Sequence, residues 1–217
     1  MVQRESLLGA VRKRRYDGAL YGAAMARPRK FDEQALLDAA TELFWSQGYD
    51  ETSVDDVSTA SGVGNGSIYA AYGSKQGLFL AVFERYCDRR AAFVEGVMDA
   101  SYDSAREAAR AFFDAIIVDC STQPGRRGCL MINSMASLGP KVPEVAAAGR
   151  RSTARMEQSL TDRLSEVLER PGDELATVSA NLVLVSQGLI QLSRQGVPRE
   201  RLDEIAAVSL EALPDAA

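Results

Sequence analysis

The spacing of apolar residues along the chain predicts a series of α-helices. After Asp32, which can cap a helix, apolar residues recur at i, i+3, i+4, i+7 and i+8 until the chain reaches Gly48. Helical spacing continues towards the C-terminus, and no strand-like alternation or internal repeat interrupts it. The sequence therefore predicts an all-α fold. Later helices are expected over residues 74–97, 103–121, 128–138, 144–169 and 173–194, with a last one after residue 198.

Residues 52–79 carry the pattern of two short helices that meet at a tight turn and are followed by a third helix. Thr52 or Ser53 can cap the first short helix, and an acidic residue three positions later completes a capping box. Gly62 supplies the permissive backbone that the turn needs. In the second short helix Ile68 faces inward, while small and polar residues remain outside. This arrangement is a helix-turn-helix.

The same residues resemble the DNA-binding motif of the TetR/AcrR family of one-component transcriptional regulators. The sequence departs from the family pattern at Ser61, Gly64 and Gly73, and Gly64 removes a potential cap from the second short helix. The matching positions are Thr52, Asp56, Val57, Gly62, Val63, Gly66, Ser67, Ile68, Tyr69, Tyr72, Ser74, Lys75, Leu78 and Phe79.

The resemblance implies that the second short helix enters the major groove of double-stranded DNA. Side chains expected in the groove are Asn65, Ser67 and Tyr69, and Gly66 would allow the backbone to approach closely. Asn65 could instead serve only as a helix cap. The expected phosphate contacts are Thr52, Ser53, Tyr72 and Lys75, together with Arg27, Arg29 and Lys30 before the first helix.

The distribution of charge also bears on DNA binding. The net charge is −5, but residues 1–31 contain eight Lys/Arg against two Asp/Glu, whereas residues 32–217 contain seventeen against twenty-eight. The two parts therefore carry +6 and −11. Because an acidic body repels DNA, the basic arm and a few local contacts must supply most of the attraction to phosphates. The alternative for Arg27, Arg29 and Lys30 is a solvated tail.

The length of 217 residues suits one large or two small domains. We expect a helix-turn-helix domain over residues 25–73 and a ligand-binding and dimerisation domain over residues 74–217, with Ser74 opening the connecting helix. Residues 1–24 are expected to be a disordered extension. Met25 is a second methionine and opens Met-Ala-Arg-Pro-Arg-Lys, which is how many members of the family begin. Residues 1–24 therefore either precede the native start site or form a genuine basic arm.

Several classes of function are disfavoured by composition. The chain has no histidine, which removes Ser/His/Asp and Cys/His catalysis and His-based zinc sites. Its three cysteines are odd in number and unpatterned, which argues against a disulfide framework. No apolar run approaches the eighteen residues of a membrane span, and no secretory signal is evident. We therefore expect a cytoplasmic protein that is not an enzyme, does not enter a membrane and uses no cofactor or metal.

The C-terminal helices are expected to bind a small effector of unknown identity. Cys129 could act as a sensor, because some family members sense metals or electrophiles with such a cysteine and because Arg126 and Arg127 could lower its pKa. It could equally be a small buried apolar residue. Side chains that could line the cavity, or could simply form core, are Phe83, Phe112, Phe113, Ile116, Cys129, Met131, Met135 and Met156.

The last two helices carry more apolar surface than one core requires, which suggests a four-helix interface in a homodimer. The resemblance implies a repressor that binds a pseudo-palindromic operator as a dimer and is released by its effector. The alternative is an all-α ligand-binding or interaction protein that does not bind DNA.

Overall fold

The structure, a computed structural model, describes residues 31–211 and residue 213, and these residues confirm the all-α fold. Residues 1–24, Arg27, Arg29 and Lys30 lie outside this range. The elements are α1 (Glu33–Gln47), α2 (Val54–Ser61), α3 (Asn65–Tyr72), α4 (Lys75–Met98), α5 (Ala105–Thr122), the 3-10 turn η1 (Pro124–Arg126), α6 (Leu130–Ser137), α7 (Pro143–Leu168), α8 (Gly172–Arg194) and α9 (Arg199–Glu211).

Local hydrogen bonds explain why the first helices begin where they do. The Asp32 carboxylate accepts from the Ala35 amide at 3.1 Å and caps α1. Ser53 and Asp56 form the expected capping box at the start of α2, and Ser74 accepts from the amide of Gly77 at the start of α4. Between α2 and α3, Gly62 adopts a left-handed conformation at φ 71°. The predicted turn is therefore present.

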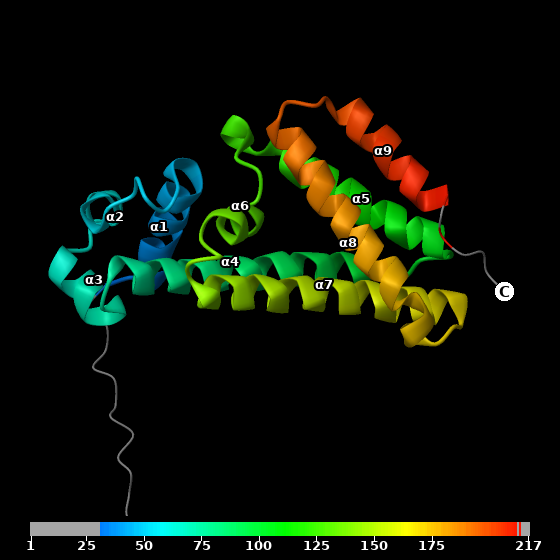
Figure 1. The fold of residues 1–217 in the computed structure, drawn as a ribbon, viewed down its shortest axis with the longest axis horizontal. Helices are drawn as coiled ribbons and strands as arrows, with labels where there is room; N and C mark the ends of the chain where they lie inside the picture. Colours follow the sequence, from blue (N-terminus) through cyan, green and yellow to red (C-terminus); the bar gives the residue numbers. More distant parts are fainter. Residues whose placement is uncertain (1–30, 212, 214–217) are drawn as a thin grey trace, which may run out of the picture. The chain divides into compact units, whose positions relative to one another are not determined.

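Helices α1 and α3 pack on the first half of α4, and α2 packs on α1 and α3 (Figure 1). Their shared core is aromatic: Phe44 meets Phe79 edge to face at 5.1 Å, and Tyr49 meets the same Phe79 ring at 5.1 Å. Ile68 of α3 is also buried. This packing anchors one face of α3, so the opposite face is left to solvent.

The remaining helices form the rest of the bundle. α4 lies beside α7, α8 packs on α7 and α5, and α9 lies along α5 and α8 (Figure 1). The described residues from Asp32 onward form one compact unit. The domain boundary expected at residue 74 falls within that unit and remains a prediction.

Helix α8 requires one correction to the sequence analysis. Among the helices within residues 31–211, α8 is the one that is long and apolar enough to cross a membrane, because its most apolar stretch contains few charged side chains. It is nevertheless a packed helix, with Leu175, Leu182 and Leu189 buried against its neighbours.

Candidate nucleic-acid interface and ligand-binding region

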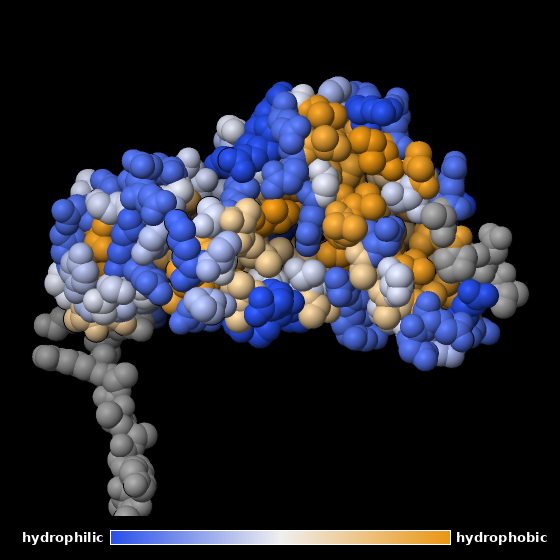
Figure 2. Space-filling view, in the orientation of Figure 1, coloured by the Kyte–Doolittle hydropathy of each residue, from blue (hydrophilic) through white to orange (hydrophobic). Residues whose placement is uncertain are grey.

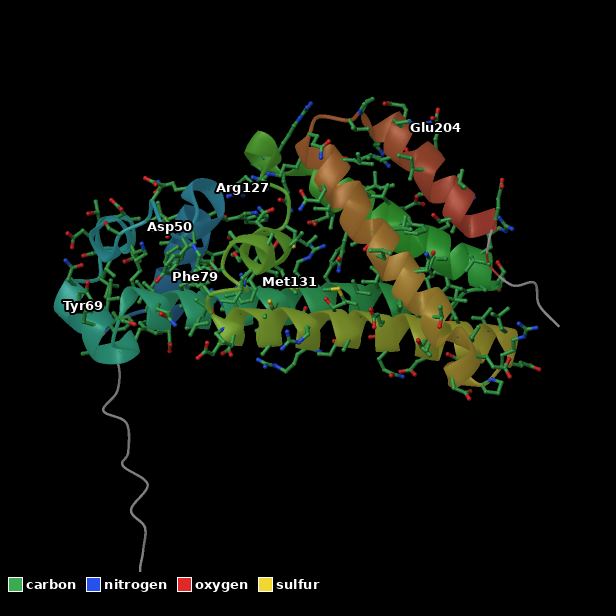
Figure 3. All side chains as sticks on the ribbon, viewed as in Figure 1. Asp50, Tyr69, Phe79, Arg127, Met131 and Glu204 are labelled. Carbon is green, nitrogen blue, oxygen red and sulfur yellow. The ribbon has the colours of Figure 1, made fainter. Side chains whose placement is uncertain are left out.

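The outer face of α3 is small, polar and accessible. Tyr69 is 50% exposed and lies at the outer side of the helix (Figure 3). Gly66 and Ser67 are not buried on the same helix. Ile68 is the one fully buried side chain of α3, whereas Gly66, Ser67, Tyr69 and Ala70 are exposed.

Gly66 has no steric reason to be glycine within the chain. A Cβ atom placed on it would meet nothing within 4 Å, and its φ is not in the left-handed region. A glycine inside a helix costs about 0.5–1 kcal/mol relative to alanine. The space beside Gly66 is therefore open to a binding partner.

Asn65 begins α3 but does not cap it. The N-cap of α3 is Gly64, which makes no side-chain hydrogen bond, as the sequence suggested. The Asn65 amide instead donates to the Asp55 carboxylate of α2, and its own carbonyl oxygen has no hydrogen-bond partner among the described residues. To contact a base, this side chain would have to exchange its bond to Asp55.

Thr52 is not placed to contact a phosphate, which corrects the sequence assignment. Its side chain is fully buried, and its hydroxyl donates to the carbonyl of Gly48 at 2.8 Å. A second carbonyl, that of Leu43, lies at 3.4 Å. Thr52 therefore ties the end of α1 to the start of α2. Ser53 is exposed, although its hydroxyl is engaged with Asp56 at 2.6 Å.

Tyr72 and Lys75 are half-buried and already engaged. The Tyr72 hydroxyl donates to the Glu33 carboxylate at 3.0 Å. The Lys75 ammonium donates to the carbonyl of Asp50 at 3.2 Å and lies 4.5 Å from the centre of the Tyr49 ring. Lys75 is the first residue of α4, where the helix dipole also favours an anion. Of these two side chains, Lys75 is the better placed for a phosphate.

Helix α1 is bound to the C-terminal helices through ionic and aromatic contacts. Arg127, in the segment before α6, reaches α1 (Figure 3) and pairs with Glu42 at 2.6 Å. Its guanidinium lies 4.2 Å from the centre of the Trp45 ring, and Trp45 in turn meets Tyr86 of α4 edge to face at 5.2 Å. This link has no signal in the sequence, because residues 42 and 127 are adjacent only in the folded chain.

The predicted effector residues do not converge on one cavity. Met131 and Met135 line a cavity of about 470 Å³ between α6, α7 and α8. Phe113 lines a different one of about 210 Å³ against α9. The other members of the predicted set, Phe83, Phe112, Ile116, Cys129 and Met156, are buried side chains of the helix packing.

The larger of these two cavities also contains residues that sequence reasoning missed. Arg150, Thr153 and Glu157 of α7 and Gln187 of α8 complete its lining, together with Ile132 and Ala154. The three α7 residues recur at helical spacing, which is a detectable signal. That signal does not say which polar stripe of a long helix faces a cavity.

Cys129 is buried at the start of α6, where it meets Tyr86 of α4. The Tyr86 hydroxyl donates to its sulfur at 3.5 Å, and all three cysteines of the chain are free and buried. Burial, and next the proximity of Cys129, raise the pKa of Cys87 to about 12.

From the sequence we expect Arg126 and Arg127 beside Cys129, but the structure brings Arg90 of α4 close to it instead. Arg127 is occupied by Glu42, and Arg126 packs against Gly196. Arg90 pairs with Asp119 at 2.7 Å. Burial acts to lower the pKa of Arg90, but the charges of Cys129 and Asp119 outweigh it, so the net pKa is raised.

Comparison with known proteins gives a consistent result. Residues 36–82 match the family model described as bacterial regulatory proteins, tetR family. The chain is 33% identical over 193 residues to the HTH-type transcriptional repressor ComR of Escherichia coli (strain K12), an alignment that covers 87% of this chain and 92% of ComR. It is 27% identical over 194 residues to the HTH-type transcriptional repressor BdcR of the same organism, covering 86% and 91%.

A solved structure with the same fold contains DNA. A cysteine mutant of the TetR family transcriptional regulator CifR, complexed with a 26-base-pair double-strand operator, aligns with a TM-score of 0.71 and 28% identity. The alignment covers 87% of this chain and all of that one.

Proposed function

Because the chain belongs to the tetR family of bacterial regulatory proteins, we propose that it is a DNA-binding transcriptional regulator that represses its target genes as a dimer. The observation that carries this proposal is the outer face of α3, where Tyr69 is half exposed beside small and polar residues while Ile68 anchors the helix. Such a face suits a major groove, which admits one α-helix. A regulator of bacterial genes works where the DNA is, in the cytoplasm.

In the groove, Ser67 and Tyr69 would contact base edges, and Asn65 would do so after releasing Asp55. Gly66 would let the helix backbone approach the duplex. Phosphates would be held by Ser53, Tyr72 and Lys75. Arg27, Arg29 and Lys30 precede α1 in the sequence and would add charge that the motif itself lacks, since residues 50–75 contain four acidic residues and one lysine.

The dimer would form through α8 and α9. Each of these helices carries a large apolar side chain that is exposed: Leu184 of α8 is 65% exposed and Val208 of α9 is 67% exposed. Hydrophobic residues gather over α8 and α9 on the face that Figure 2 shows. A symmetric pair would place its two α3 helices in successive major grooves about 34–36 Å apart, so the operator would be a pseudo-palindrome.

Release would require a ligand that binds the DNA-incompetent geometry more tightly than the competent one. The cavity of about 470 Å³ lined by Met131 and Met135 is the proposed effector site, and its volume lies in the usual range for small-molecule pockets. Arg150 and Glu157 give it one charge of each sign. Because α7 lies along α4, a ligand that displaces α7 would act on the helix that supports α3.

The sensor role of Cys129 remains a second hypothesis within this proposal. The hydroxyl of Tyr86 donates to the Cys129 sulfur at 3.5 Å, so a modification of this sulfur would disturb the packing between α4 and α6. Alkylation of the native protein would then abolish operator binding in wild type but not in Cys129→Ser. An equal response in both proteins would leave Cys129 as a packing residue.

A mobility-shift assay tests the main proposal. DNA flanking the protein's own gene is compared with a scrambled duplex of equal length, using wild type and Tyr69→Ala. We expect selective binding by wild type and loss of selectivity in the variant, whose exposed side chain is not needed for folding. The rival function, a ligand-binding or interaction protein without DNA-binding activity, predicts no selective binding by either. The relatives are named as regulators, and we propose no catalytic activity.

A further inference from the structure

A separate cavity of about 350 Å³ lies between the end of α1, helix α6 and the end of α8. From α1 and the residue pair that follows it come the aromatic side chains of Phe44, Trp45 and Tyr49. α6 contributes the polar side chains of Asn133 and Ser134. None of the predicted effector residues lines it, so it is distinct from the cavity at Met131 and Met135.

The lining of this cavity carries positive charge and no acid. Arg194 of α8 is its one charged residue, although residues 32–217 as a whole carry −11. Arg194 donates to the Asn133 side-chain oxygen at 2.8 Å, and the Asn133 amide donates to the carbonyl of Arg127 at 2.9 Å. The guanidinium is therefore held in place while most of its donors remain available.

A second donor lies in the same lining. The indole N–H of Trp45 is buried and has no hydrogen-bond partner among the described residues. A buried donor without an acceptor costs about 1–3 kcal/mol. Because this N–H is closed to solvent, a ligand oxygen would reach it only after the indole turns towards the cavity. The cavity thus combines a cation held by Asn133 with aromatic side chains.

We propose that this cavity binds a compact organic carboxylate with an aromatic or apolar body. The carboxylate pairs with Arg194, since a guanidinium matches a carboxylate in charge and in geometry. The apolar body lies against the aromatic side chains of α1. A neutral ligand of the same shape gains the aromatic contacts but not the charged pair.

The place of the cavity gives binding a consequence. Its walls come from α1, which packs on α2 of the motif, and from α6 and α8 of the C-terminal part. A ligand held there would contact Trp45 of α1 and, at the same time, the C-terminal helices α6 and α8. This site does not depend on operator binding, so it can be tested without DNA.

Trp45 is the only tryptophan of the chain, which makes its fluorescence a direct probe of this cavity. The full-length protein is titrated with benzoate and phenylacetate, and separately with their neutral isosteres benzamide and phenylacetamide. We expect a saturable change with the carboxylates and an affinity lower by about tenfold or more for the amides, the loss of one charge-assisted pair.

Three variants locate the signal. Arg194→Gln should weaken carboxylate binding about tenfold or more. Ala136→Leu, at an exposed lining position, should do the same by filling the cavity while leaving Arg194 intact. Arg150→Gln, in the other cavity, should bind as wild type does. Unchanged melting temperatures identify the variants that remain folded.

The proposal is overturned if neither carboxylate gives a saturable change, if the amides bind as tightly, or if both Arg194→Gln and Ala136→Leu keep wild-type affinity. Loss of binding in Arg150→Gln would also overturn it, because the carboxylate would then occupy the effector cavity. None of these outcomes bears on operator recognition, which the mobility-shift assay tests separately.

Discussion

The fold does not require a glycine at position 66, whereas a DNA duplex close to α3 would. Gly66 lies inside α3, exposed, and a Cβ atom at this position would have no neighbour within 4 Å, so the chain gains nothing from the missing side chain. Glycine in a helix carries an entropic cost relative to alanine. A residue that weakens its own helix without an internal reason is understandable if the space above it is filled by DNA.

Gly66→Ala should therefore make the protein more stable and a weaker binder. Alanine at this position should raise the free energy of unfolding by up to about 1 kcal/mol, while its methyl group holds α3 away from the groove. Gly96→Ala is the matched control, because Gly96 is also exposed inside a helix with open space around it but lies far along α4. Thermal unfolding and mobility shift check both. Equal operator affinity for the two variants would contradict the role of Gly66.

The residues that sequence reasoning placed correctly are those whose role is local. Asp32, Ser53 and Ser74 cap helices because capping depends on the next three residues, which the sequence displays. Thr52 matches the family motif equally well but is buried, since its environment is set by the end of α1 rather than by its neighbours in sequence. Burial by a distant segment has no signal in the local pattern.

Helix α1 is held to the rest of the molecule by two sets of ionic contacts. Asp38 pairs with Arg85 of α4 at 2.8 Å and lies 3.3 Å from Arg89. Desolvation raises the pKa of Asp38, but hydrogen bonds and charge from these arginines outweigh it, so the net pKa is lowered. On the other side, Arg127 reaches α1 from the segment before α6. The motif is thereby attached to both α4 and α6.

Arg127→Met should lower the free energy of unfolding by about 1–2 kcal/mol, because it removes a mostly buried guanidinium from both Glu42 and the Trp45 ring. Arg151→Met is the control, since Arg151 and Glu84 are each more than half exposed and 3.5 Å apart. Such a surface pair contributes about 0–1 kcal/mol. Urea unfolding followed by circular dichroism measures both, and similar losses would show that the Arg127 link is not special.

The bounds of the helices were largely readable from the sequence. The helix expected over 74–97 is α4, Lys75–Met98, and the one expected over 173–194 is α8, Gly172–Arg194. Gly73 precedes α4, and Pro171 and Gly196 flank α8; the effect of such residues on the backbone is local. Which helices lie side by side was not readable, because several faces of α7 and α8 are compatible with burial. For that reason the predicted effector residues do not lie around one cavity.

The charge distribution of the whole chain makes a prediction about salt. Each phosphate contact contributes about 0.9 to the slope of log affinity against log salt. Replacing Arg27, Arg29 and Lys30 together by alanine should thus flatten the slope by about 2–3, and Lys75→Ala by about 1. Binding measured from low to moderate salt gives the slopes. If the triple variant keeps the wild-type slope, those three residues form a solvated tail.

The dimer makes a prediction about α8 and α9. Leu184→Glu should place a charge in the paired surface and yield a monomer that no longer binds the operator. Val118→Glu is the control, because Val118 is an exposed apolar residue, 42% accessible, on α5. Sedimentation velocity at micromolar concentration distinguishes monomer from dimer. A dimer that survives Leu184→Glu would place the interface elsewhere.

The central claim is that paired subunits present α3 to two successive major grooves. Hydroxyl-radical footprinting of the protein on DNA flanking its own gene tests it most directly. We expect two protected segments related by a pseudo-dyad, with centres about one helical turn apart, and loss of both in Tyr69→Ala at unchanged melting temperature. A single unpaired segment, or the same protection with and without the Tyr69 side chain, would contradict the account.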